Sequence, residues 1–210
     1  MPKEKIKQLL REPEARGVLF LYGGAVFHFL YAAYRLFTGM LYRKNHLDAA
    51  VIFYLSLAFN RLSLIFAYKR RHIAPTVSSA LSRSGRLLYV TVGCMLLLIA
   101  EVIAGTRRVS YPRFALYISG GYALVATVLA ILELLYLGRL KSPLLSASRT
   151  VGLASALLSA YTFVGDLLFS LSFSDEGRVI VLLVLGAVLL LLLLFFAAAF
   201  SVTRERKSDA

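Results

Sequence analysis

The sequence contains the stretch LLSASRTVGLASALLSAYTFVGDLLFSL, residues 144–171, which has the length of a membrane-spanning helix but an unusual face. At helical spacing, one stripe holds only small or polar residues: Ser148, Gly152, Ser155, Ser159, Thr162, Asp166 and Ser170. Hydroxyl and carboxyl groups gain nothing from hydrocarbon, so we expect this face to point into protein or water. Two interpretations stay open: a close-packed interface whose hydroxyls bond their own helix carbonyls, or the wall of a pathway or binding site.

The rest of the chain has the composition of a membrane protein. Of its 210 residues, 59% are hydrophobic and 17% are charged, and the mean hydropathy is +0.74. Soluble proteins average about 45–50% apolar and about 25% charged residues. Five further apolar runs reach roughly 20 residues each, enough to cross a hydrocarbon core of about 30 Å. We therefore predict an all-α fold of six transmembrane helices, at about 17–41, 47–68, 86–105, 112–137, 144–171 and 178–202.

These helices make one transmembrane domain, residues 17–203, between a polar lead (1–16) and a basic tail (204–210). The segment between 69 and 85 is predicted to be the one long loop. The last helix contains VIVLLVLGAVLLLLLLFFAAAF, residues 179–200, without a polar side chain. We expect it at the lipid-facing edge of the bundle, with Gly186 at a packing point.

The distribution of basic residues predicts the orientation. Of the 24 Lys and Arg residues, two (Arg35 and Arg61) lie within helices. Six lie on one side of the membrane: Arg43, Lys44, Arg107, Arg108, Arg113 and Arg178. The other sixteen lie on the opposite side, which places both termini in the cytoplasm. The net charge of +13 is thus a topology signal, and we expect no nucleic-acid partner.

Six ionisable residues fall inside the predicted helices: His28, Arg35, Arg61, Glu101, Glu133 and Asp166. Each costs about 2.5–3.5 kcal/mol at a helix centre, so partners are expected. The rise per residue places Arg61 and Glu133 in the inner third of the membrane and the other acids, with Arg35, in the outer third. We predict an inner pair of Arg61 with Glu133, and an outer pair of Arg35 with Glu101 or Asp166. The alternative for Arg35 and Glu133 is snorkelling to the interface.

The candidate ligand- or ion-binding residues surround the outer pair: Asp166, Glu101, Arg35, His28, Ser159, Thr162 and Tyr31. The acids suit a cation or proton, and tyrosines such as Tyr31 and Tyr122 suit an amphipathic or cationic ligand. Hydrogen-bonded packing is the alternative role for His28. The three histidines lie on different segments, so neither a metal site nor a cofactor is predicted. No catalytic motif indicates an enzyme.

An internal repeat is faintly visible. Residues 22–39, YGGAVFHFLYAAYRLFTG, and 119–138, SGGYALVATVLAILELLYLG, each have Gly-Gly near the start and a charged residue near the end. Three helices per repeat would give halves of opposite orientation, as in inverted-repeat transporters.

Three motifs carry a resemblance: LYRK (41–44), VIFYLSLAFNRL (51–62) and SPLLSASR (142–149). Together the chain resembles an uncharacterised family of bacterial six-helix integral membrane proteins. The resemblance implies a bacterial cytoplasmic membrane and assigns no activity. The length and helix number also look like the substrate-binding subunits of energy-coupling-factor vitamin transporters. Their first helix shows an Ala-x-x-x-Ala surface; the first predicted helix here lacks that spacing, although Ala100 and Ala104 have it in the third.

Three hypotheses about function follow. The first is a small transporter, or a membrane-embedded transporter subunit, with a charged site between helices. The second is an accessory or assembly protein whose buried charges are structural. The third is a substrate-capture subunit of a multi-component importer. The expected partners are membrane lipid, a second copy or a partner membrane subunit, and a small-molecule or ion substrate.

Overall fold

The computed structural model describes residues 13–42, 49–70, 74–104, 113–137, 143–171 and 174–208. These residues form six helices: α2 (Pro13–Tyr42), α3 (Ala49–Lys69), α4 (Ala74–Ile103), α5 (Arg113–Leu137), α6 (Pro143–Ser170) and α7 (Asp175–Ser208). Each helix contains a stretch that is long and apolar enough to cross a membrane. The predicted all-α, six-helix membrane fold is therefore confirmed.

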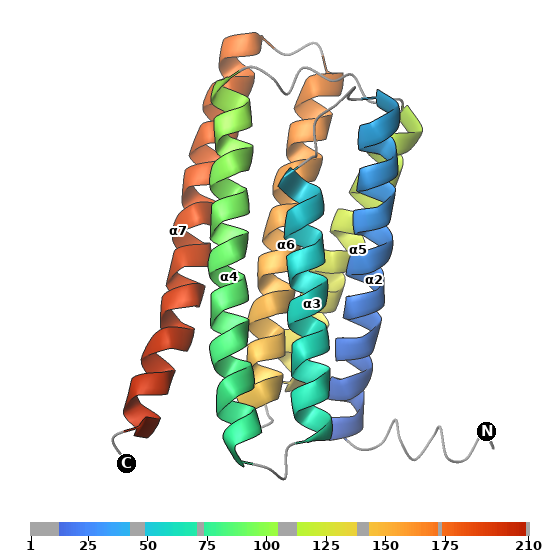
Figure 1. Cartoon of the computed structure of the whole chain (residues 1–210). Helices are drawn as coiled ribbons and strands as arrows, with labels where there is room; N and C mark the ends of the chain where they lie inside the picture. The colour runs from blue at the N-terminus through green and yellow to red at the C-terminus, as the bar shows by residue number, and fades with distance from the viewer. Residues whose placement is uncertain are drawn as a thin grey trace, which may run out of the picture.

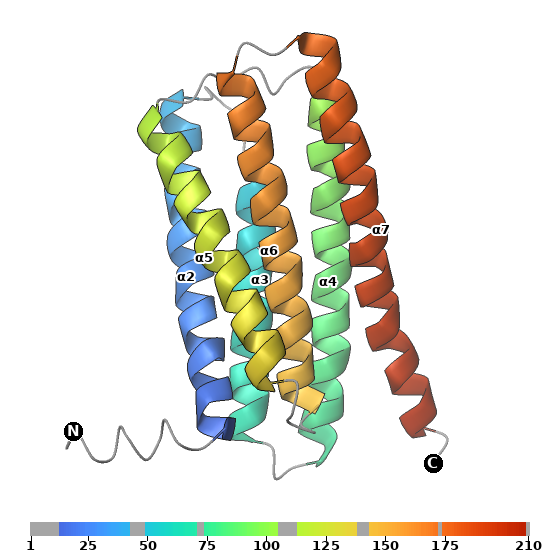
Figure 2. The same cartoon turned by 180° about the vertical axis from the view of Figure 1, so that it is seen from behind.

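The helices pack as an upright bundle in which successive helices run in opposite directions (Figure 1). α2, α3 and α4 pack side by side, and so do α5, α6 and α7. Across these two layers, α2 faces α5, α3 faces α6, and α4 faces α7. Figure 2, the view from behind, shows α5 and α6 in front of α2 and α3. Helix α2 begins and α7 ends at the same end of the bundle.

The centre of the bundle is formed by α3 and α6, the two most deeply buried spans. Helix α7 is the least buried span, and its C-terminal part leans away from α4 in both views (Figures 1 and 2). A Cβ on Gly186 would lie 2.9 Å from Ile99 Cγ1 of α4. Gly186 is therefore a point of close packing, and α7 lies at the lipid-facing edge, as its composition predicts.

The small and polar face of α6 is buried. Ser148, Gly152, Ser155, Ser159, Thr162 and Asp166 all lie inside the bundle. The buried part of the stripe ends at Asp166. Ser170 is exposed, and its hydroxyl donates a hydrogen bond to Leu167 O of its own helix. As predicted, the face points into protein from Ser148 to Asp166, and only its last residue, Ser170, is exposed.

Two predicted boundaries were wrong. Residues 74–85 belong to α4 and not to a long loop, because Pro75 lies in the first turn, where its missing N–H is not needed. Helix α7 begins at Asp175, where Ser174 Oγ accepts a hydrogen bond from Gly177 N as a cap, and continues to Ser208 through most of the predicted tail. Helix α2 begins at Pro13 and so includes residues 13–16 of the predicted lead, whereas residues 1–12 and 209–210 lie outside the described residues.

Candidate functional site

The inner pair of charges lies between α3 and α5. Arg61 Nη1 is 2.7 Å from Glu133 Oε1, and the two side chains are only 3% and 1% exposed. Arg61 Nη1 also donates to Phe20 O of α2 at 3.2 Å. Neither charge snorkels to the interface, because both side chains are enclosed by the bundle. The pairing is the one expected from the depths of these residues in the sequence.

Two glycines make room for this ion pair. A Cβ on Gly24 of α2 would lie 2.5 Å from Arg61 Cζ, and a Cβ on Gly152 of α6 would lie 2.4 Å from Glu133 Oε2. Four helices thus meet around one guanidinium and one carboxylate. Only glycine allows the α2 and α6 backbones to approach the charges this closely.

His28 of α2 links the inner pair to a tyrosine of α5. Arg61 Nε donates to His28 Nε2 at 3.3 Å, and His28 Nδ1 is 2.8 Å from Tyr122 OH. An arginine Nε can only donate, so His28 Nε2 accepts, and the neutral imidazole carries its proton on Nδ1. His28 therefore donates to the Tyr122 hydroxyl.

The outer pair joins α2 to α6. Arg35 Nη1 is 2.9 Å from Asp166 Oδ2, with side-chain exposures of 4% and 3%. Ser119 of α5 donates to the same Asp166 oxygen at 3.0 Å, and Tyr31 OH donates to Ser119 Oγ at 3.2 Å. Arg35 lies eleven residues beyond Gly24 on α2, so the two ion pairs are about 16 Å apart along the helix axis.

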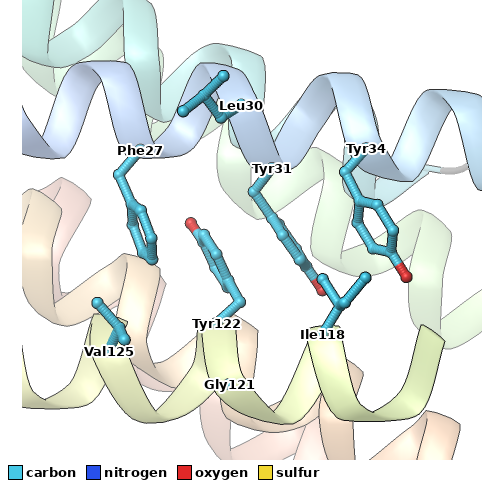
Figure 3. Close-up of a pocket in the computed structure, with 8 residues that line it drawn as sticks. All are labelled: Phe27, Leu30, Tyr31, Tyr34, Ile118, Gly121, Tyr122 and Val125. Atoms are coloured by element: carbon cyan, nitrogen blue, oxygen red, sulfur yellow. The ribbon is translucent and has the colours of Figure 1, made fainter. Parts of the chain in front are cut away.

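Stacked rings separate the two networks. Tyr31 of the outer network and Tyr122 of the inner network stack with centroids 3.5 Å apart and planes at 12° (Figure 3). Polar groups thus run from Glu133 through Arg61 and His28 to Tyr122. They continue from Tyr31 through Ser119 to Asp166, and the ring stack is the break between the two chains. We call this series of residues the polar path.

The inner end of the polar path has unsatisfied polar atoms. Glu133 Oε2, Ser148 Oγ and Ser155 Oγ are buried and have no hydrogen bond of acceptable geometry among the described residues. Ser148 nevertheless lies close enough to Glu133 to interact with its carboxylate. The two serines flank Gly152 on α6, where an added Cβ would collide with this carboxylate. Ser155 likewise lies close enough to Tyr122 to interact with its hydroxyl, so both serines border the polar path.

The remaining predicted site residues have different surroundings. Thr162 Oγ1 is 3.3 Å from Tyr54 OH of α3, and it also donates to Ser159 O. Ser159 Oγ donates to Ala156 O of its own helix, which matches the packing interpretation for that residue. Glu101 is half-buried on α4, which packs against α3, α6 and α7, whereas Arg35 lies on α2. Of the two acids proposed for the outer pair, Asp166 is the one that contacts Arg35.

Sequence reasoning missed Ser119, which contacts both Asp166 and Tyr31. A signal was available: Ser119 precedes Tyr122 by three residues, and both lie on the buried face of α5. The contact with Asp166, however, depends on how α5 packs against α6, and no spacing within one helix contains that information.

The site consists of buried ion pairs, hydroxyl groups and aromatic rings. In the described part of the chain, no three histidine, cysteine or acidic side chains come together as metal ligands would. No protein-family model matches the chain, and no curated protein or solved structure is significantly similar to it. A functional conclusion therefore rests on the geometry of the site.

Proposed function

We propose that this protein is a small membrane transporter in which a proton or small cation moves along the polar path. The observation that carries the proposal is a pair of buried polar networks that start at ion pairs about 16 Å apart along α2 and meet at the stack of Tyr31 on Tyr122. Ionisable residues inside membrane spans are costly, and they commonly mark ion pathways and proton relays. A scaffold that needed only firm packing has little reason to join charges at two depths, because buried ion pairs are weak stabilisers.

Glu133 is the best candidate for binding the proton or cation at the inner end. Its Oε2 is buried without a close hydrogen bond among the described residues, and the Ser148 hydroxyl lies beside its carboxylate. Asp166 forms an ion pair with Arg35 and accepts a hydrogen bond from Ser119, and these contacts close the outer end of the path. In the conformation observed, both ends of the path are closed. Transport requires the two ion pairs to open to water at different times.

The arrangement of helices supports an inverted repeat of α2–α4 with α5–α7. Each helix packs against its proposed counterpart: α2 with α5, α3 with α6, and α4 with α7. Exchanging α2 with α5 and α3 with α6 turns the Arg61–Glu133 pair into the pair of Asp166 with Arg35, with the charges reversed. Such pseudo-symmetry supplies two related states, open to opposite sides, in transporters built this way.

A structural accessory role is the second candidate. It is favoured by the enclosure of both ion pairs and by the hydroxyl of Ser159, which is used within its own helix. A substrate-capture subunit remains a third form of the transport proposal, in which a partner membrane subunit drives the movement. We also propose a bacterial cytoplasmic membrane, with both termini cytoplasmic, on the strength of the sequence resemblance and the basic residues.

Thiol accessibility separates transport from a static bundle without knowledge of the substrate. Cys94 is the chain's single cysteine, and it is buried, so Cys94→Ala gives a background without thiols. Ser159→Cys then places a thiol at the buried midpoint between the two ion pairs. A transporter exposes this thiol to a membrane-impermeant methanethiosulfonate reagent in sealed vesicles, because the path opens to water.

Two control variants frame this measurement. Ser170→Cys, at the exposed end of α6, should react readily from one side and shows that the reagent works. Ala154→Cys is fully buried on α6, off the polar stripe, and should stay unmodified. If Ser159→Cys is as unreactive as Ala154→Cys from both sides, the accessory role replaces transport.

A further inference from the structure

A groove on the outside of the bundle runs between α2 and α5. Its volume is about 400 Å³, and its lining residues are Phe27, Leu30, Tyr31, Tyr34, Ile118, Gly121, Tyr122 and Val125 (Figure 3). α2 and α5 contact each other less extensively than either contacts its chain neighbour, α3 or α6. Aromatic side chains, more than backbone, fill the space between them.

Four rings form the inner wall of the groove. Tyr122 of α5 lies between Phe27 and Tyr31 of α2, with ring centroids 4.6 Å and 3.5 Å away, and Tyr34 continues the row (Figure 3). The phenol oxygens are engaged inside the protein: Tyr31 with Ser119, Tyr122 with His28, and Tyr34 with Ala115 O. The rings therefore present carbon surfaces to the groove.

The rim of the groove faces the bilayer. Leu30 is 65% exposed, and Ile118 and Val125 of α5 are 44% and 42% exposed. All of them lie within the membrane-spanning parts of their helices, so the groove is continuous with the surface that contacts hydrocarbon. Gly121 adds depth, because a Cβ at this position would meet no atom within 4 Å.

We propose that this groove binds one hydrocarbon chain of a membrane phospholipid. The lining offers no charged group, and its volume lies within the range of about 300–1,000 Å³ typical of ligand sites. A slot between two neighbouring helices suits a chain better than a helix, which is about 10–12 Å wide. Association within a bilayer relies on close packing, which the ring wall and the space at Gly121 provide. The inference does not rest on the proposed transport.

The occupied groove touches the polar path directly. Tyr31 and Tyr122 each border the groove and have a hydroxyl in the path. A chain packed against both rings holds them in their stacked arrangement.

Tryptophan fluorescence provides the test, because the chain contains no tryptophan. Ile118→Trp and Leu30→Trp each place a single fluorophore on one rim of the groove. Leu124→Trp, on α5, is a control at a residue that is 67% exposed and does not line the groove. Each variant is reconstituted in phosphatidylcholine with a rising mole fraction of dibrominated phosphatidylcholine, which quenches tryptophan on contact.

The proposal expects half-maximal quenching at the rim at about a threefold lower mole fraction than at Leu124→Trp, the ratio that a few added carbon–carbon contacts provide. Gly121→Leu should remove that difference, whereas Gly93→Leu, an exposed glycine with the same open space, should preserve it. Equal quenching at the rim and at the control would mean ordinary lipid contact and would overturn the proposal. Weaker quenching at the rim would mean that a protein surface covers the groove, and it would overturn the proposal as well. A difference that survives Gly121→Leu would place the chain elsewhere.

Discussion

The inner and outer ion pairs are built from the same chemical groups but sit in different surroundings. At the inner pair, the backbones of Gly24 and Gly152 lie directly against Arg61 and Glu133. At the outer pair, Ser119 donates a hydrogen bond to Asp166 and accepts one from Tyr31, which also borders the lipid-facing groove. The inner pair is thus packed against helix backbone, whereas the outer pair has a hydrogen-bonded hydroxyl group, that of Ser119, beside it. We expect substitutions to be more costly at the inner pair and more easily absorbed at the outer one.

The largest effect is expected from removing the inner cation. Arg61→Met leaves Glu133 buried without a counter-charge and should cost about 3–5 kcal/mol of unfolding free energy. Glu133→Gln should cost less, because Arg61 keeps Phe20 O and His28 Nε2 as acceptors. Unfolding in mixed micelles of rising dodecyl sulfate content measures both losses. The double substitution should be milder than Arg61→Met alone, and strictly additive losses would show that the two residues do not act as a pair.

A smaller effect is expected from crowding the inner pair. Gly152→Ala places a methyl group against Glu133 Oε2 and Arg61 Nη2, where it must displace the carboxylate, at a cost of about 1–3 kcal/mol. Gly93→Ala is the matched control, since its Cβ meets open space. The control should change stability by no more than about 1 kcal/mol. Equal behaviour of the two variants in the same unfolding assay would contradict the tight packing of the inner pair.

The outer pair should tolerate the loss of its hydroxyl partner. Ser119→Ala removes one charge-assisted hydrogen bond but leaves Arg35 on Asp166, so we expect a loss of about 1–2 kcal/mol. Ser170→Ala, whose hydroxyl bonds its own helix at an exposed position, should have almost no effect on unfolding. A loss at Ser119 as large as that of Arg61→Met would reverse the ranking of the two pairs.

The smallest effect is expected at the ring stack between the pairs. Tyr122→Phe keeps the ring stack with Tyr31 but removes the hydrogen bond to His28. We expect it to lower the unfolding free energy by about 1 kcal/mol. Tyr117→Phe, on the same helix with its side chain 75% exposed, serves as the control. If Tyr122→Phe matches this control in melting temperature in detergent, the Tyr122–His28 bond makes no contribution to the stability of the closed state.

The fold was largely predictable because each span carries its own signal of length and hydropathy. The buried face of α6 was predictable for the same reason: the spacing of Ser148, Ser155 and Asp166 lies within one helix. Residue depth also predicted which charges lie at the same level, and so the pairing of Arg61 with Glu133. Residue depth could not decide between Glu101 and Asp166 as the partner of Arg35. Depth does not show that α4, which carries Glu101, lies away from α2.

Specific contacts between helices could not be predicted from the sequence. The role of Ser119, the approach of Gly24 to Arg61 and the groove beside Gly121 all depend on how α5 and α6 sit against α2 and α3. The extent of α4 was missed for a local reason. A polar segment with a proline has the composition of a loop, yet a proline in the first turn is compatible with a helix.

The most direct test of the central claim asks whether the two ion pairs close opposite ends of one path. Ser159→Cys in the Cys94→Ala background lies seven residues from both Gly152 and Asp166, about 10 Å along α6 from each. Asp166→Asn should speed its modification by a membrane-impermeant thiol reagent from the side where Ser170 lies, and Glu133→Gln should do so from the opposite side. Acceleration from the same side by both substitutions, or by neither, would contradict the account.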